Sequence, residues 1–198
     1  MIIHDVIQGS EAWHKLRLGR FTATDLATVA NGKKATIDTL IYKKVAERIT
    51  GLPASERYIN ANMERGLDLE SEARTAFEFR TGIEVDVVGF CSLDDWVGCS
   101  PDGLIGENKG IEIKCKDNHT HLECLLHGDN SYRWQIQGNL YVTGRDSWYF
   151  ISYNPNFPIE KQLYITEYGR DDDALSKIEQ GLMYAVDKAK EIWREYEG

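Results

Sequence analysis

The chain has 198 residues, of which 42% are hydrophobic, and its 32 acidic and 23 basic side chains give a formal net charge of −9. A chain of this length and composition can bury a core as one domain without disulfides, and no apolar run approaches the roughly 18 residues of a membrane span. The first residues lack the layout of a signal peptide, so we expect a cytoplasmic protein. The four cysteines form no C-x-x-C pair and lie near no histidine at zinc spacing, which argues against a zinc site.

The charge is distributed unevenly along the chain. Residues 1–60 contain nine Lys and Arg against six Asp and Glu, a net charge of +3, so the remainder carries −12. Phosphate contacts are short-range at physiological salt, and an acidic protein can therefore bind nucleic acid through a local basic surface. The total charge neither favours nor excludes a DNA partner.

The first half of the chain is predicted to be helical. Ser10 has the side chain of a helix N-cap, and glycines stand where the first, third and fourth helices would end. Apolar residues recur at helical spacing over 37–49 and again before Gly82. The four predicted helices start near Ser10, at Thr22 or Thr24, at about 36 and at about 60, and the last of them ends at 81.

The second half alternates between strand and helix patterns. Strand-like runs cover about 83–91, 95–100 and 110–116, and two more fall at 147–153 and 161–168. A helix is predicted from 131 to 144, and a long amphipathic helix from Asp171 onward. This order predicts an α/β fold with a central mixed sheet flanked by helices, as a single domain over residues 1–198.

One predicted strand carries charged residues on one of its faces. In the segment CSPDGLIGENKGIEIKCK, the side chains of Glu112 and Lys114 share a face, while Ile111 and Ile113 point the opposite way. Asp102 precedes Glu112 by ten positions, and the glycines between them allow a hairpin that returns Glu112 to Asp102. An isolated Glu–Lys pair is typical of a solvated strand face, but the nearby Asp102 favours a functional site.

These residue types suit metal-assisted hydrolysis. Two carboxylates that converge repel each other unless a cation lies between them. Oxygen ligands favour Mg²⁺ or Mn²⁺ over zinc. A lysine beside the ion can position or deprotonate a water, because its pKa is readily lowered in such a site. The sequence therefore predicts the parts for hydrolysis of a phosphodiester.

Four segments together resemble one family of nucleases. The pattern SPDG followed by EIK resembles the PD-(D/E)XK signature, and three further stretches resemble the phage lambda-type exonucleases, also called the viral recombinase or alkaline exonuclease family. These stretches are AWHKLRLGRFTATD, RGLDLESEARTAFEF and YRWQIQGNLYVTGRDSWYFISYNP. The resemblance runs from about Trp13 to Pro155 and implies the PD-(D/E)XK fold, which is that of restriction endonucleases.

The resemblance implies roles for particular residues. Asp102, Glu112 and the backbone carbonyl of Ile113 would bind metal, and Lys114 would act on the attacking water. Glu70 would lie near a second ion, and it falls in a stripe of otherwise mostly apolar residues on its predicted helix. An arginine-paired or exposed glutamate is the alternative for this position.

Further residues would line the site and hold the DNA end. Tyr132 and Gln135 are neighbours on one helical face, and the resemblance places both in the active site, with Gln135 also contacting DNA. Arg17, Thr24 and Ser100 match a pocket for the terminal 5′-phosphate, which suits the bidentate chemistry of a guanidinium. Thr24 stands where the family commonly has serine.

The resemblance also implies an activity and partners. We expect a Mg²⁺-dependent 5′-to-3′ exonuclease that digests one strand of duplex DNA to mononucleotides and leaves 3′ single-stranded overhangs. Two ions per site, with Mn²⁺ able to replace Mg²⁺, a homotrimeric ring and a phage single-strand annealing protein belong to the same expectation, as does action in the host cytoplasm from a phage or prophage gene. A PD-(D/E)XK endonuclease or repair nuclease and a non-catalytic DNA-end-binding module are the alternatives.

Overall fold

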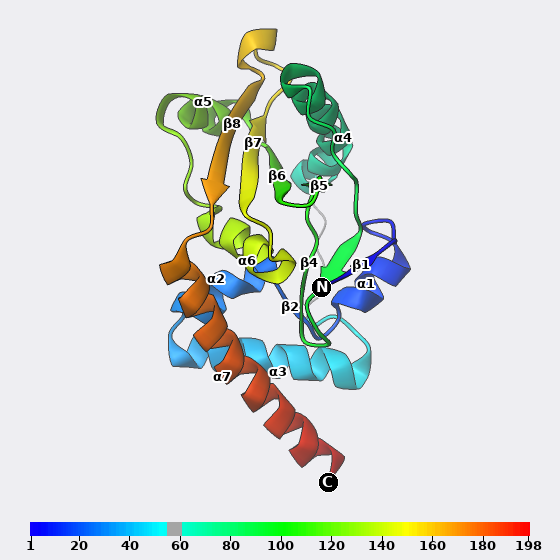
Figure 1. Cartoon of the computed structure of the whole chain (residues 1–198). Coiled ribbons are helices and arrows are strands. Elements are labelled where there is room, and N and C mark those ends of the chain that lie inside the picture. Colours follow the sequence, from blue (N-terminus) through cyan, green and yellow to red (C-terminus); the bar gives the residue numbers. More distant parts are fainter. Residues whose placement is uncertain (55–60) are drawn as a thin grey trace.

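The computed structural model describes the backbone of residues 1–54 and 61–198 and the side chains of residues 1–54 and 69–198. Within these ranges the strands form two four-stranded sheets, ordered β1-β3-β4-β2 and β5-β6-β7-β8 (Figure 1). The strands are β1 (Ile2–His4), β2 (Phe21–Thr22), β3 (Phe90–Ser92), β4 (Val97–Cys99), β5 (Gly103–Ile105), β6 (Lys109–Cys115), β7 (Ser147–Tyr153) and β8 (Leu163–Gly169). The helices are α1 (Glu11–Arg17), α2 (Ala23–Asn31), α3 (Lys34–Thr50), α4 (Ala61–Thr81), α5 (Asn118–His127), α6 (Arg133–Thr143) and α7 (Asp172–Glu197), with the 3₁₀ turn η1 (Ile159–Lys161).

The sheet formed by β5 to β8, called the larger sheet because three of its strands have seven residues each, is mixed and covered on both faces. Strand β6 runs parallel to β7, while β5 and β8 are antiparallel to their neighbours. The parallel pair requires a crossover, which α5 and α6 supply. Helix α4 packs on one face of this sheet, and α5 and α6 pack on the other (Figure 1). The predicted α/β fold with a mixed sheet between helices is confirmed, except that the strands form two sheets. An isolated bridge from Asp86 to Leu104 joins the segment before β3 to β5.

This covering explains the charged strand face. Ile111 and Ile113 pack with Phe77 in the core beneath α4. Glu112 projects to the opposite face, where its register partner Phe150 belongs to the core beneath α6. Since both faces are buried, the carboxylate of Glu112 has to find its partners inside the protein.

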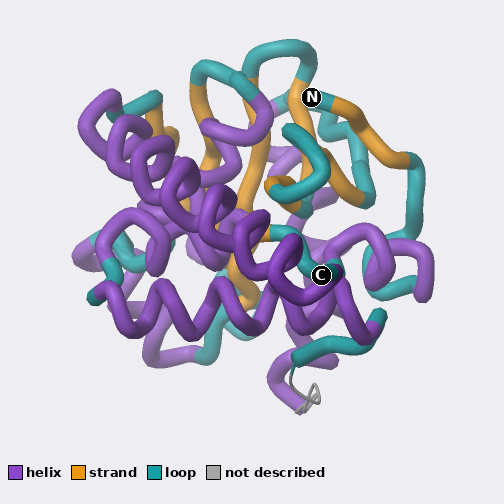
Figure 2. The backbone as a smooth tube through the Cα atoms, turned by 90° about the horizontal axis from the view of Figure 1, so that it is seen from below, coloured by secondary structure: helices purple, strands orange, loops and turns teal. Residues whose placement is uncertain are grey.

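Helices α2, α3 and α7 pack against one another in the half of the molecule that contains the smaller sheet, β1 to β4. Helix α7 crosses α2 and α3, and Figure 2 shows these helices in front of the strands. At the contact with α2, a Cβ on Gly181 would lie only 2.3 Å from the carbonyl oxygen of Val29. Glycine therefore stands inside α7, despite its low helix propensity, because the α2 backbone approaches at that point. No helix in the described ranges is both long and apolar enough to cross a membrane.

The predicted strands and their observed lengths differ most between residues 83 and 100. The run 83–91 was predicted as one strand, but the observed strand β3 starts at Phe90, and before it only Asp86 pairs with another strand. Alternating apolar residues gave the strand pattern, yet Gly89 lies against the carbonyl of Val6, and its position leaves no room for a Cβ. The sequence did not predict strands β1, β2 and β5, because two or three residues are too few to show the alternation of apolar and polar side chains that indicates a strand.

Candidate active site

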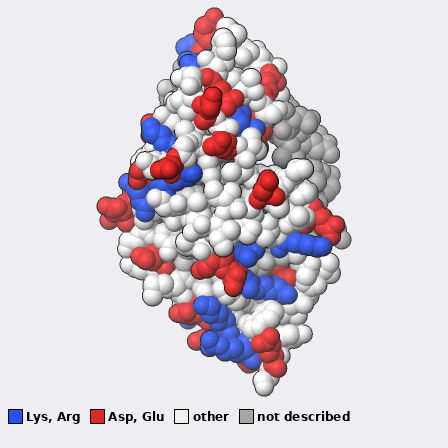
Figure 3. Space-filling model, turned by 45° about the vertical axis from the view of Figure 1, so that its right-hand side comes forward, with Lys and Arg blue, Asp and Glu red and all other residues white. Residues whose placement is uncertain are grey.

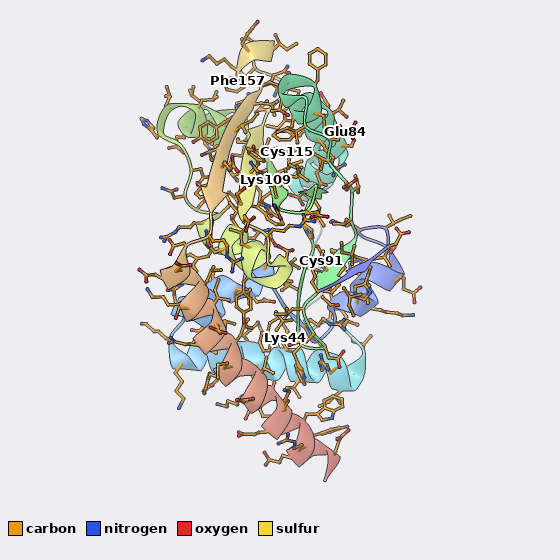
Figure 4. The ribbon with its side chains drawn as sticks, in the orientation of Figure 1. Lys44, Glu84, Cys91, Lys109, Cys115 and Phe157 are labelled. Carbon is orange, nitrogen blue, oxygen red and sulfur yellow. The ribbon has the colours of Figure 1, made fainter. Side chains whose placement is uncertain are left out.

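The β5–β6 hairpin brings Asp102 and Glu112 together. The antiparallel register pairs Gly103 with Ile111, so one step further Asp102 stands opposite Glu112. An oxygen of the Asp102 carboxylate, Oδ2, accepts a hydrogen bond of 2.6 Å from the backbone N–H of Ile113. In Figure 4, the labelled Lys109 and Cys115 mark the two ends of β6, and Glu112 and Lys114 lie between them. The convergence of the two acids that the sequence predicts is present in the structure.

Glu112 is held from three sides. Only 1% of this residue is exposed. Its Oε1 accepts hydrogen bonds of 2.5 Å from Lys114 Nζ and of 2.5 Å from Gln135 Nε2, and its Oε2 accepts one of 3.1 Å from Asn139 Nδ2. Sequence reasoning missed Asn139, although a poor helix former four residues after Gln135 was a signal that could have found it.

The charges in this cluster shift one another. Burial raises the pKa of Asp102 well above its usual range, and the nearby carboxylates of Glu112 and Glu70 raise it further against the opposing effect of Lys114. Burial also lowers the pKa of Lys114, but Glu112 and Asp102 together outweigh that effect, so the pKa of Lys114 lies above its ordinary value. The expected lowering of the lysine pKa concerns a lysine beside a bound ion. In the metal-free arrangement the pKa is raised instead, because the ammonium group lies beside the acids Glu112 and Asp102.

Glu70 lies in the same cluster but is paired with an arginine. Arg74 Nη2 donates to Glu70 Oε1 at 2.7 Å and to the backbone carbonyl of Asp102 at 3.0 Å. Burial raises the pKa of Glu70, and Arg74 and Lys114 act in the opposite direction. Ala73, which belongs to the mostly apolar stripe predicted around Glu70, is buried. Glu70 is therefore paired with an arginine, as in the alternative reading. The same arginine also joins it to the backbone of Asp102.

Tyr132 stands at the start of α6, next to two ammonium groups. Its ring stacks on Phe150, with 5.4 Å between centroids and 21° between planes. Lys114 Nζ and Lys116 Nζ lie 5.0 Å and 5.1 Å from the centroid of the tyrosine ring. Such contacts between a cation and an aromatic face hold the lysine side chains in place. The structure therefore gathers Tyr132 and Gln135 with the acids and Lys114.

A second group of residues surrounds Ser100, just before Asp102. Arg17 Nη1 donates to Ser100 Oγ at 2.7 Å, and Trp13 Nε1 lies 3.0 Å from the same oxygen. The Arg17 guanidinium also lies 4.4 Å from the centroid of the Trp13 ring. The structure thus joins Arg17 to Ser100 and fixes both through a buried tryptophan.

Thr24 lies in the first turn of α2. It is exposed, and its hydroxyl lies 3.2 Å from that of Thr22, which is the N-cap residue of α2. A cavity of about 390 Å³ opens beside Arg17, and its lining includes Thr22 and not Thr24. The residues that line this cavity are His14, Arg17, Leu18, Thr22, Lys44, Glu47 and Pro53.

The donor set at the hairpin suits a small divalent cation. Side chains in the described part of the chain form no cluster of three or more His, Cys, Asp or Glu residues that could hold a metal ion. The candidate donors are two carboxylates, Asp102 and Glu112, and the carbonyl of Ile113, all of them oxygen. Mg²⁺ in proteins is bound by one or two carboxylates and keeps several waters. The residues present therefore fit Mg²⁺ or Mn²⁺, and all four cysteines are free thiols.

Comparison with solved structures places this fold in the class of the exonucleases. The crystal structure of an alkaline exonuclease (LHK-Exo) from Laribacter hongkongensis is similar over 95% of this chain and 96% of that chain, with a TM-score of 0.85 and 31% identity. The structure of LHK-Exo in complex with dAMP is 32% identical over 94% and 96% of the two chains, with a TM-score of 0.85. A phage related exonuclease from Haemophilus somnus 129PT shares the fold at 15% identity, with a TM-score of 0.69 over 92% and 99% of the two chains.

The family follows from the sequence match. Residues 12–146 match the YqaJ-like viral recombinase domain, and the chain belongs to this family. The viral recombinase resemblance seen in the sequence is thereby confirmed. None of the curated proteins compared with the chain matches it.

Proposed function

We propose that the chain is a metal-dependent exonuclease of phage recombination, folded as one nuclease domain over residues 1–198. It would digest the 5′-ended strand of duplex DNA to mononucleotides and leave a 3′ single-stranded overhang. The observation that carries this proposal is the position of Asp102 opposite Glu112, with Lys114 hydrogen-bonded to Glu112 on the same strand face. The similarity to an alkaline exonuclease, solved also in complex with a mononucleotide, supports it.

Asp102, Glu112 and the carbonyl of Ile113 would hold Mg²⁺, with Mn²⁺ able to replace it. Glu70 would contribute to a second ion. Arg74 is bonded to one oxygen of this carboxylate, Oε1, and the charge of Glu70 acts on Asp102. When bound, such ions supply a nucleophilic water and stabilise the charge that develops on the phosphate. Burial and, after it, the charges of Glu112 and Glu70 raise the pKa of Asp102. A cation at this place would offset those charges, which supports the proposed metal site.

The remaining residues would orient and move protons around the reacting phosphate. Lys114 in its ammonium form donates hydrogen bonds, so it would orient the attacking water and stabilise charge. Taking a proton from that water requires the neutral amine, which in turn requires a weaker ion pair with Glu112. Gln135 and Tyr132 would fix Glu112 and Lys114, as their contacts in this structure support.

Arg17 and Ser100 would bind the terminal 5′-phosphate of the DNA, and Thr24 would extend this pocket. A guanidinium and a hydroxyl joined by a hydrogen bond are two phosphate donors already placed together. On the face shown in Figure 3, acidic and basic side chains are interspersed. The duplex would be held by local contacts near the site.

The same family assignment supports the proposed assembly and setting. We propose a homotrimeric ring around the DNA, which would keep a net-acidic subunit on its substrate. A phage single-strand annealing protein would receive the overhang, in the cytoplasm of a host cell.

Digestion of linear duplex DNA tests the proposed function. One 5′ end or one 3′ end carries a label, and the reaction is run with Mg²⁺ or EDTA on 5′-phosphorylated, 5′-hydroxyl and closed circular DNA. We expect Mg²⁺-dependent release of mononucleotides from the 5′ end, fastest with a phosphate and absent on circles. Cleavage of circles would instead support the endonuclease, and binding without digestion would support the inert end-binding module.

A further inference from the structure

Asn139 reaches the carboxylate of Glu112 from the second turn of α6. Its side chain is fully buried, and its Nδ2 donates to Glu112 Oε2 at 3.1 Å. Gln135, four residues earlier, donates to the other oxygen of the same carboxylate at 2.5 Å. Since residues four apart share one face of a helix, α6 holds both oxygens of Glu112 with two successive amides.

This arrangement leaves a buried polar atom without compensation. The other end of the Asn139 amide, Oδ1, is buried and has no hydrogen-bond partner among the residues that the structure describes. The opposite orientation of the amide would set Oδ1 against Glu112 Oε2, and two acceptors repel. An unpaired buried carbonyl costs about 1–3 kcal/mol. A stable α6 alone does not need this residue, because asparagine is also a poor helix former.

Gln137 on the same helix differs from Asn139, because both ends of its buried amide are hydrogen-bonded. It is 1% exposed and both ends of its amide are bonded, with Nε2 donating to Gly169 O at 2.8 Å and Oε1 accepting from Asp171 N at 3.0 Å. Gln137 therefore joins β8 to α7 and satisfies every polar atom it buries. Asn139 satisfies only the bond to Glu112, so the contact with that carboxylate is what the amide provides.

We propose that Asn139 is a positioning residue that fixes the Glu112 carboxylate toward a divalent ion. This inference rests on the proposed function and adds a residue to it. With N–H donors on both oxygens, the carboxylate keeps one orientation and presents its remaining lone pair in a fixed direction. Loss of a residue that orients a metal ligand typically lowers metal affinity about 10–100-fold.

The test measures Mn²⁺ binding to the DNA-free protein by electron paramagnetic resonance, with thermal melting in EDTA alongside. The variants are Asn139→Leu, which has a similar volume, and Asn139→Ala, which fits wherever asparagine fits. Gln137→Leu is the matched control on the same helix. We expect both Asn139 variants to bind Mn²⁺ at least about 10-fold more weakly. Their melting temperature should stay close to that of the parent, because removal of the unpaired Oδ1 offsets the lost bond to Glu112. The control should melt at a lower temperature and keep the parental Mn²⁺ affinity.

The outcomes separate the two proposals. Parental Mn²⁺ affinity in the Asn139 variants overturns the positioning role and leaves the proposed function standing. A parent that binds no Mn²⁺ overturns both. If neither Asn139 variant folds while Gln137→Leu does, Asn139 is a requirement of folding, and the positioning role is refuted.

Discussion

Two isosteric substitutions at the paired acids should have opposite effects on stability. Asp102→Asn and Glu112→Gln each replace a carboxylate by an amide of the same shape, and both should abolish cleavage if the two acids bind the metal. Without metal, however, the acids differ in their surroundings. Burial and two neighbouring carboxylates raise the pKa of Asp102, whereas Glu112 receives three hydrogen bonds, one of them from an ammonium group.

The stabilising effect expected for Asp102→Asn follows from the raised pKa of Asp102. The folded chain keeps a proton on Asp102 that the unfolded chain loses near pH 3.9. The stability that this proton provides is fully present below that pH and is lost as the pH rises through the higher pKa of the folded state. Asparagine mimics the protonated form, so we expect Asp102→Asn to stabilise the metal-free protein at pH 8 by about 1–2 kcal/mol, the size of a typical stabilising substitution.

Glu112→Gln should instead lower the stability of the metal-free protein. A hydrogen bond to a charged group contributes about 1.5–3 kcal/mol. Glutamine has one acceptor oxygen in place of two, so its amide nitrogen would face one of the three donors. Lys114 would also lose the carboxylate to which it is bonded at 2.5 Å. We therefore expect Glu112→Gln to destabilise the metal-free protein by about 2–3 kcal/mol.

Thermal melting in EDTA measures both effects. For a domain of this size, 1 kcal/mol corresponds to a shift of about 2–4 °C. Asp102→Asn should raise the melting temperature by about 2–8 °C at pH 8, with a smaller gain toward pH 4, and Glu112→Gln should lower it by about 4–12 °C. Glu123→Gln, on the exposed surface of α5, is the control and should change little. Shifts of the same sign at Asp102 and Glu112 would refute the electrostatic reasoning.

Three further predictions address the site and the packing. Lys114→Ala should abolish digestion while duplex binding, followed by fluorescence anisotropy, remains; a fully active variant would remove the lysine from the mechanism. Arg17→Ala should reduce the advantage of 5′-phosphorylated over 5′-hydroxyl ends in digestion rates, and an equal loss on both ends would indicate folding or general DNA affinity instead. Gly181→Ala should destabilise the protein by at least about 1 kcal/mol in denaturant unfolding, although alanine is the better helix former, because its Cβ would meet the Val29 carbonyl; an increase in stability would show that α7 can move away from α2.

The sequence predicted those helices and strands that are long enough to show a periodic spacing of apolar residues. The long helices and the strands β6, β7 and β8 have enough residues to show a period, and β6 also shows which side chains share a face. The second sheet depends on the few residues that pair β1 with β3, β3 with β4 and β2 with β4. Such pairings join residues that are distant in the chain, and two or three residues contain no period by which to find them.

The same distinction applies to the site. The spacing of Asp102 and Glu112 indicated a hairpin, and strand alternation put Lys114 beside Glu112, because these relations are local. Asn139 and Arg74 lie on other elements, and their roles depend on how α6 and α4 dock on the sheet. The direction of the lysine pKa could not be predicted either, since it depends on whether burial or the two acids prevail. Residue type and spacing thus identify the acids and the lysine, while the packed helices decide in which charge state and orientation these groups are held.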